Sequence, residues 1–266
     1  MSLPDYAGYR ALKVELRGEM LWLVIDNPPV NASSPELRDD FDRIFREAAI
    51  DPRVRCVVLT GAGETFSAGG DIRRMQRMLT DQADWLLTMR EARTLVLDML
   101  EFDKPLIGRI NGDALGLGAT LALCCDITIM REDARIGDTH VRMGLVAGDG
   151  GALLWPILVG LTNARRYLLS GDLITGREAE AMGLVTFAAA AEEFDALVDK
   201  WAARLSSGAT HAIVGTKRAL NMAVRQQAAA YMDAHLGLET MSHLRDDHRE
   251  AVEAFLDKRK PRFTGN

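Results

Sequence analysis

The residues best suited to chemistry lie in one glycine-rich stretch, THVRMGLVAGDGG, at residues 139–151. In it His140 lies nine residues before Asp149, which has a glycine on each side. The ordinary pKa of histidine is close to neutral pH, so an imidazole is a natural general base. A carboxylate that accepts the N–H of its other ring nitrogen would fix the tautomer and stabilise the imidazolium. The pair therefore predicts proton transfer or water activation. The alternative is a rim histidine and an aspartate that caps a helix beginning at Gly150.

Alternating strands and helices are expected to position this pair. Residues 11–28 alternate apolar and polar side chains around a turn at 17–19, which predicts an antiparallel hairpin. Ser33 and Glu36 have capping-box spacing, with Pro35 in the first turn of the helix that would follow. Apolar runs predict strands at 55–61, 105–111 and 127–130, and helices at 83–102, 118–126, 163–170, 177–182, 192–206 and 210–258. This order predicts an α/β fold with right-handed crossovers.

Composition excludes several classes of partner. The chain has 266 residues, a formal charge of −6 and a pI of about 5.5, so it presents no basic surface for nucleic acid. Its one basic cluster, KRKPRF, is local, at residues 258–263. Three cysteines predict no disulfide framework and favour a reducing compartment. No apolar stretch is long enough to span a membrane, and the first residues lack a signal-peptide pattern. We expect a cytoplasmic protein without nucleic-acid or membrane partners.

Two glycine-bearing loops follow two of the predicted strands, at residues 60–72 and 110–120. Ligands of α/β folds gather beyond the carboxyl ends of strands, where glycine lets backbone N–H groups face a substrate. Paired backbone donors would stabilise an enolate or a tetrahedral oxyanion. The alternative is that both loops are simple turns. Neither loop has a phosphate-binding lysine or a GxGxxG motif, which argues against nucleotide binding of those kinds.

Four ordered motifs resemble the crotonase, or enoyl-CoA hydratase/isomerase, superfamily. They are ETFSAGGDIRRM, KPLIGRINGDALGLGATLALCCDI, LLSGDLITGREAEAMGLV (168–185) and FLDKRKPRF (255–263). The resemblance implies a crotonase-like ββα spiral over residues 1–205. It also implies a helical C-terminal region, 206–266, for oligomerisation and contact with coenzyme A. A homotrimer or a dimer of trimers (a homohexamer) is expected.

The resemblance also implies an acyl-CoA site. Its oxyanion hole would be the backbone N–H groups of Ala68 and Leu117. Coenzyme A would be part of the substrate, and no other cofactor and no metal are expected. The binding contacts would come from the same two residues together with Gly69, Gly70, Asp71, Ile72, Phe255 and Lys258. A lysine suits the phosphates of coenzyme A and an aromatic ring its adenine, although KRKPRF could equally be a solvated tail.

Two departures separate this chain from the hydratases that it resembles. Hydration in that family uses two glutamates, which would fall at Thr120 and His140. Threonine is not a general base near neutral pH, so ordinary hydration is in doubt. The spacing of His140 and Asp149 resembles the β-diketone hydrolase branch, in which a histidine held by an aspartate delivers water and a carbon–carbon bond breaks. Glu239 falls near a glutamate that this branch also uses.

Two alternatives remain open. One is a non-catalytic acyl-CoA-binding paralogue that has lost both glutamates. The other is a true hydratase that uses another acid, such as Asp113 or Asp138. We interpret the remaining histidines and the adjacent cysteines as structural, packing or surface residues: His211, His235, His243, His248, Cys124 and Cys125.

Overall fold

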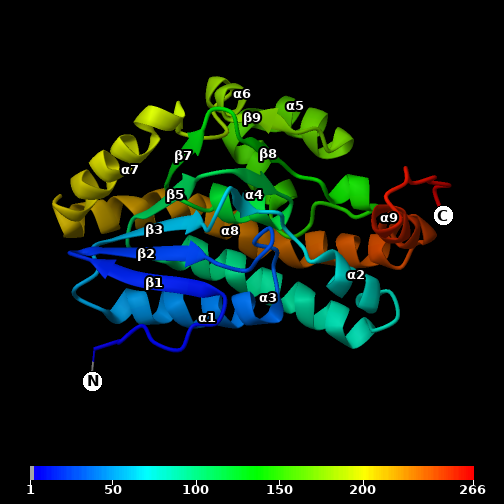
Figure 1. The fold of residues 1–266 in the computed structure, drawn as a ribbon, viewed down its shortest axis with the longest axis horizontal. Coiled ribbons are helices and arrows are strands. Elements are labelled where there is room, and N and C mark those ends of the chain that lie inside the picture. Colours follow the sequence, from blue (N-terminus) through cyan, green and yellow to red (C-terminus); the bar gives the residue numbers. More distant parts are fainter. Residues whose placement is uncertain (1–2) are drawn as a thin grey trace.

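Ten strands form two sheets in the computed structural model, which describes residues 3–266 (Figure 1). In spatial order, the six-stranded sheet contains β1 (Leu12–Arg17), β2 (Met20–Ile25), β3 (Cys56–Gly61), β5 (Leu106–Ile110), β7 (Ile127–Arg131) and β10 (Phe187–Ala189). The four-stranded sheet contains β4 (Thr65–Ser67), β6 (Asp113–Leu115), β8 (Arg135–Gly137) and β9 (Ile174–Thr175). The predicted hairpin is confirmed, because β1 and β2 pair antiparallel.

The chain alternates between the two sheets. Each of β3, β5 and β7 is followed by a short strand of the second sheet, β4, β6 and β8 respectively. Within each sheet these strands pair in parallel. This is a ββα spiral, so the predicted fold class is confirmed. The turn from one sheet to the other brings the loops after β4, β6 and β8 to one place, and the candidate site is built there.

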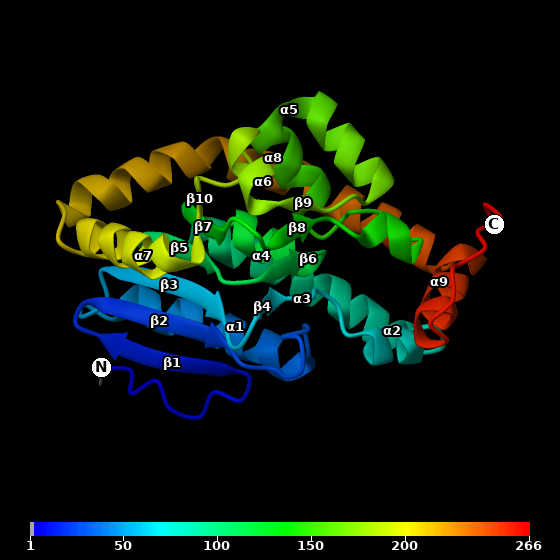
Figure 2. The same ribbon diagram turned by 45° about the horizontal axis from the view of Figure 1, so that its top comes forward.

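Helices lie above and below the sheets in Figure 1, and β1 lies at an edge of the molecule in Figure 2. The helices are α1 (Pro35–Ile50), α2 (Ile72–Met78), α3 (Gln82–Glu101), α4 (Leu117–Leu123), the 3₁₀ helix η1 (His140–Met143), α5 (Gly151–Ser170), α6 (Gly176–Ala181), α7 (Ala191–Ser206), α8 (Thr210–His243) and α9 (Asp246–Leu256). The segment expected to be helical from 210 to 258 is two helices, because the chain turns between His243 and Asp246. Helix α5 is interrupted at Gly160, whose φ of 73° lies outside the helical region.

The start of α1 differs from the capping box expected at Ser33. The N-cap is Ser34, whose side chain accepts a hydrogen bond from the Leu37 amide, and Pro35 begins the helix. Ser33 has another partner, because its Oγ accepts from Nε of Arg38 at 3.0 Å. Only Ser33 has a glutamate three residues later, at Glu36, yet Ser34 is the residue that caps the helix.

One large hydrophobic core joins the early and late parts of the chain. It includes Phe41 of α1, Val96 of α3 and Ile110 of β5, and α8 adds Ala228 and Met232. A smaller cluster on the other face of the first sheet lies under α7. Within residues 3–266, no helix is long and apolar enough to cross a membrane.

Candidate active site

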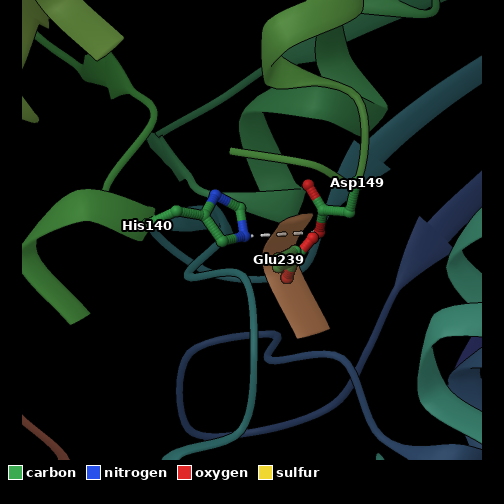
Figure 3. Close-up of side chains that lie close together, drawn as sticks. All are labelled: His140, Asp149 and Glu239. Atoms are coloured by element: carbon green, nitrogen blue, oxygen red, sulfur yellow. Dashed lines mark ion pairs between the residues drawn. The ribbon is translucent and has the colours of Figure 1, made fainter. Parts of the chain in front are cut away.

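His140 lies at the start of η1, directly after β8, and carboxylates flank both of its ring nitrogens. Nδ1 lies 2.7 Å from Oδ1 of Asp138, which also accepts the His140 backbone N–H at 3.1 Å. Nε2 lies 3.4 Å from Oδ2 of Asp149 (Figure 3). All three side chains are buried, with relative exposures of 2% for Asp138, 8% for His140 and 5% for Asp149. The orienting position that the sequence assigned to Asp149 is therefore held by Asp138, and Asp149 faces the other nitrogen.

Glu239 reaches the same cluster from α8 (Figure 3). Its side chain is 2% exposed, and ligand-type atoms of His140, Asp149 and Glu239 all lie within 4.8 Å of one another. Within residues 3–266, Oε2 of Glu239 and Oδ1 of Asp149 are buried without a hydrogen-bond partner. Two unpaired carboxyl oxygens beside an imidazole can bind a water molecule or accept a proton from a substrate. The same donor types could hold a divalent cation.

Glycines allow Asp149 to sit in this crowded position. A Cβ at Gly148 would lie 2.5 Å from the carbonyl oxygen of His235 in α8, and a Cβ at Gly150 would lie 2.4 Å from Cγ2 of Thr120 in α4. Gly150 also has a φ of 134°, which side chains of L-residues rarely permit. Gly150 is the N-cap of α5, which receives no side-chain cap. The interpretation of Asp149 as a helix cap is therefore wrong.

Burial and charge set the protonation of the cluster. Burial alone would lower the pKa of His140, but the negative charges of Asp149 and Asp138 outweigh it and raise that pKa well above its ordinary value. Burial and the neighbouring Asp149 charge raise the pKa of Glu239 well above its ordinary value. Burial opposes ionisation of Asp149, but the His140 charge prevails and lowers its pKa. These shifts favour an imidazolium, an ionised Asp149 and a protonated Glu239.

Thr120 and Asp113 do not share this chemistry. Thr120 is buried in α4, and its methyl group lies against Gly150. Asp113 accepts hydrogen bonds from the backbone N–H and the guanidinium of Arg135, so it belongs to a surface ion pair. Of the two other acids considered from the sequence, only Asp138 lies in the cluster.

The two glycine-bearing loops meet at the site. A Cβ at Gly69 would lie only 3.3 Å from the backbone nitrogen of Leu117, which is the first residue of α4 and so has a free N–H. The Ala68 amide, which the resemblance gives as the other oxyanion donor, donates to the Val30 carbonyl at 3.0 Å in this structure. The Gly70 amide has no hydrogen-bond acceptor within residues 3–266, and Gly70 lines the same pocket as Leu117.

A pocket connects these loops to the acid–base cluster. Its polar lining comprises Ser33, Arg38, Asp71, Arg74, Thr88, His140, Asp149 and Glu239, and its apolar side chains are Met75, Met78, Trp85, Met89, Leu117 and Leu145. Asp71 also caps α2, since its carboxylate accepts the amides of Arg73 and Arg74. Ile72 begins that helix without lining the pocket. The pocket places apolar side chains beside two candidate amide donors.

The expected coenzyme A contacts near the C-terminus lie apart from the pocket. Phe255 is 60% exposed near the end of α9, and Lys258 follows that helix on the surface. Neither lines the pocket. In Figures 1 and 2, α9 lies beside α2 at one end of the molecule, and the two helices are in contact.

The remaining histidines have separate surroundings. His243 stacks on Trp85 with ring centroids 3.8 Å apart, and burial lowers its pKa to about 4. Nδ1 of His248 lies 2.7 Å from the Met143 carbonyl oxygen. His211 is exposed and His235 is half-buried. Cys124 and Cys125 are buried and unpaired, and both belong to the apolar core.

Sequence reasoning missed three residues of the site. Asp138 was considered only as a rival acid, although its position two residues before His140 at the end of a strand is a usable signal. Arg38 and Arg74 reach the pocket from α1 and α2. Helix periodicity could have shown that Arg74 lies one turn from Met78 on a buried face.

Comparison with known proteins shows the family and the fold of the chain. The model of the family described as "Enoyl-CoA hydratase/isomerase" matches residues 17–266. A probable enoyl-CoA hydratase of Bacillus subtilis is 33% identical, with 91% of this chain and 94% of that protein covered. The 2,3-dehydroadipyl-CoA hydratase of Escherichia coli is 31% identical, with 96% and 98% covered. A crystal structure of an enoyl-CoA hydratase/isomerase from Mycobacterium paratuberculosis has a TM-score of 0.85 and 32% identity, and covers 93% of this chain and 99% of that one.

Proposed function

Since the chain belongs to the enoyl-CoA hydratase/isomerase family of the crotonase superfamily, we propose that it hydrolyses a carbon–carbon bond in a β-dicarbonyl acyl-CoA thioester. The observation that carries this proposal is His140, held between Asp138 and Asp149 at 2.7 Å and 3.4 Å. By the resemblance, it would stand where a hydratase has one of its glutamates. An imidazole with one nitrogen fixed by a carboxylate is suited to carrying a proton between water and a carbon atom.

The thioester carbonyl would lie at the N-terminus of α4. There the Leu117 amide and the Gly70 amide would donate to its oxygen. Backbone donors fixed by the fold stabilise developing negative charge without having to reorganise during the reaction. The start of a helix adds a partial positive charge of the required sign.

The reaction needs only water as co-substrate. A water molecule beside Nε2 of His140 gives a proton to that nitrogen while its oxygen bonds to the β-carbonyl carbon. The bond between the β- and α-carbons then breaks, so the β-carbon becomes a carboxylic acid and the electron pair enters the thioester as an enolate. His140 returns its proton to the α-carbon. If the β-carbon belongs to a ring, the product is a single ring-opened acyl-CoA.

Each carboxyl group has a separate positioning role in this scheme. Asp138 accepts from Nδ1 and so leaves Nε2 as the reacting nitrogen. Asp149 stabilises the imidazolium after proton transfer. Glu239, which stays protonated because it is buried beside Asp149, can donate a hydrogen bond to water or to Asp149. Since His140 accepts a proton only when neutral, turnover should rise with pH through its raised pKa.

Binding of coenzyme A and assembly belong to the same proposal. Phe255 and Lys258 are exposed and therefore accessible to a nucleotide bound at the surface. A trimer or a dimer of trimers would cover exposed apolar side chains on α5 and α8: Leu158, Leu161, Leu220, Met222, Leu238 and Met241. The three free cysteines fit a reducing compartment, and we propose the cytoplasm.

Two substrates measured side by side test the proposed reaction. A cyclic β-ketoacyl-CoA and crotonyl-CoA would be incubated with the wild type and with His140→Ala, and product mass would be recorded. We expect the cyclic compound to gain the mass of one water by ring opening, and this activity to be lost in the variant. Hydration of crotonyl-CoA that survives the substitution would favour a hydratase that uses another acid. Binding of both compounds without turnover would favour a non-catalytic paralogue.

A further inference from the structure

Arg74 is buried in the wall of the pocket with part of its guanidinium unpaired. It belongs to α2 and is 3% exposed. Its Nη2 and Nε donate to Asp84 at 2.6 Å and 3.2 Å. Its Nη1 has no hydrogen-bond partner within residues 3–266. An ion pair with Asp84 therefore uses one edge of the guanidinium and leaves the donors of Nη1 unused.

The neighbouring acid does not satisfy this nitrogen. Oε2 of Glu91 lies 3.6 Å from Nη2 of Arg74 and 3.6 Å from Nε of Arg38, too far for a hydrogen bond to either. Arg38 has other partners, the Ser33 hydroxyl and the Thr88 carbonyl oxygen. Arg74 thus differs from Arg38 in keeping an unused donor group.

An unpaired buried donor of this kind is unfavourable unless a ligand completes it. Leaving a buried polar group without a hydrogen-bond partner destabilises the fold, and a charged group does so more than a neutral one. Met75, Met78, Trp85 and Met89 supply an apolar part of the pocket wall. These side chains suit the methylene groups of an acyl chain and offer Nη1 no oxygen. Oε2 of Glu91 is also buried without a partner, but it lies beyond hydrogen-bond distance, so an acceptor on a molecule that enters the pocket would complete the guanidinium.

We propose that Arg74 selects acyl groups that carry a carboxylate beyond the reacting carbons, so that the substrate is the mono-CoA thioester of a dicarboxylic acid that also carries the β-carbonyl group. The thioester would lie between Leu117 and Gly70, and Gly70 is four residues before Arg74 along the chain. A carboxylate suits a guanidinium better than a neutral carbonyl does, because the charged hydrogen bonds are stronger. This inference rests on the proposed acyl-CoA site and gives the class of acyl group.

Binding of unreactive ligands tests the inference separately from turnover. Saturated dicarboxylic mono-CoA thioesters, from succinyl-CoA to pimeloyl-CoA, lack the β-carbonyl group and cannot be cleaved. Their dissociation constants would be measured by calorimetry against monocarboxylic acyl-CoA of equal chain length and against the terminal amides. We expect the best-fitting dicarboxylic thioester to bind about 10- to 100-fold more tightly than its monocarboxylic partner, since a charge-assisted hydrogen bond contributes about 1.5–3 kcal/mol.

Substitutions at Arg74 identify the source of the preference. Arg74→Gln should reduce the ratio of the two dissociation constants to about one. Arg74→Lys can keep the ion pair with Asp84 but lacks the second amino group of the guanidinium. It should therefore lose most of the preference for the dicarboxylic thioester. Arg73→Gln, on the exposed face of the same helix, is the matched control and should keep the wild-type ratio.

Each outcome has a defined meaning. If Arg74→Gln failed to fold, it would bind both ligands more weakly. The ratio of the two dissociation constants measured with Arg74→Lys would then test the inference. Equal binding of carboxylate and methyl ends by the wild type, or a preference that survives Arg74→Gln, would overturn the inference. Equal binding of amide and carboxylate would also overturn it, because the site would then accept a neutral carbonyl. Failure of carbon–carbon hydrolysis would leave these binding ratios unaffected, so the two proposals can fail separately.

Discussion

Replacing Asp138 with asparagine should lower the pKa of His140 and shift the pH dependence of turnover. Asp138 accepts from Nδ1 at 2.7 Å in a site where its own side chain is 2% exposed. Asparagine keeps the size of the side chain and removes its negative charge. The imidazolium then keeps Asp149 as its only carboxylate partner, at 3.4 Å.

The size of the effect follows from the hydrogen bond that is weakened. Hydrogen bonds to charged groups contribute about 1.5–3 kcal/mol, and a change of one pKa unit corresponds to about 1.4 kcal/mol. We therefore expect Asp138→Asn to lower the pKa of His140 by about 1–2 units. The limb of the pH–rate profile in which neutral His140 appears should move to lower pH by the same amount. The maximal rate should fall at least about tenfold, because the imidazole is less basic and its tautomer is no longer fixed.

The assay is kcat/KM for a cyclic β-ketoacyl-CoA measured across the pH range in which the enzyme is stable. An NMR titration of His140 in the unliganded protein would give the same pKa independently. Asp113→Asn is the matched control, because Asp113 pairs with Arg135 on the surface, and it should leave the profile unchanged. A profile of Asp138→Asn that coincides with the wild-type profile would refute the reasoning that Asp138 sets the proton affinity of His140.

Stability should change with pH in the same variant. The folded pKa of His140 is raised, so its ion pairs stabilise the fold fully below the unfolded value of about 6.5. That contribution is lost as pH rises through the folded pKa. Asp138→Asn should therefore lower the free energy of unfolding more at pH 6 than at alkaline pH. A loss that is equal at both pH values would show that Asp138 acts through packing alone.

Three further predictions concern the same cluster. Glu239→Gln should raise the thermal midpoint near neutral pH while slowing turnover. The raised pKa of Glu239 means that folding must keep this carboxyl protonated at pH values where it would ionise in the unfolded chain, and glutamine removes that cost. A gain of 1 kcal/mol corresponds to about 2–4 °C in a chain of this size, and a lower midpoint would contradict the prediction. Gly150→Ala should destabilise the fold by at least about 1 kcal/mol and impair turnover, since its Cβ would lie 2.4 Å from Thr120 at a φ of 134°. Gly18→Ala, at a positive φ with open space around it, is a control that separates backbone strain from the clash in denaturant unfolding. Dialysis against EDTA should leave turnover unchanged, because a protonated Glu239 and a protonated His140 are poor metal ligands. Activity that is lost on dialysis and restored by a divalent cation would instead show that these two side chains and Asp149 form a metal site.

The sequence predicted the elements of the fold better than the contacts between them. The hairpin of β1 and β2 and the strands β3, β5 and β7 carry strong local patterns, and the structure confirms them. Ser34 rather than Ser33 caps α1, and the Ser33 hydroxyl accepts a hydrogen bond from Arg38 instead. The single helix expected across 210–258 is broken where the chain turns from α8 into α9. Such details depend on side chains that meet only after folding.

For the site too, the sequence predicted the residues better than the contacts between them. His140 and Asp149 could be found from one stretch of sequence, but their geometry could not. Asp138 and Asp149 lie on opposite sides of the imidazole, and spacing alone does not say which carboxylate meets which nitrogen. Ala68 was chosen as an oxyanion donor from its motif, yet its amide is used by Val30, from a loop far back in the sequence.

Isotope labelling in ¹⁸O-water tests the central claim most directly. The wild type and His140→Ala would each be incubated with a cyclic β-ketoacyl-CoA in labelled water, and the product would be analysed by mass spectrometry. We predict that the wild type forms a ring-opened acyl-CoA with one labelled oxygen in the new carboxyl group, and that His140→Ala forms none above background. A label found instead in a hydroxyl group of an intact ring, or in the free acid left after thioester hydrolysis, would contradict the account. Equal labelling of the new carboxyl group by both proteins would contradict the role of His140.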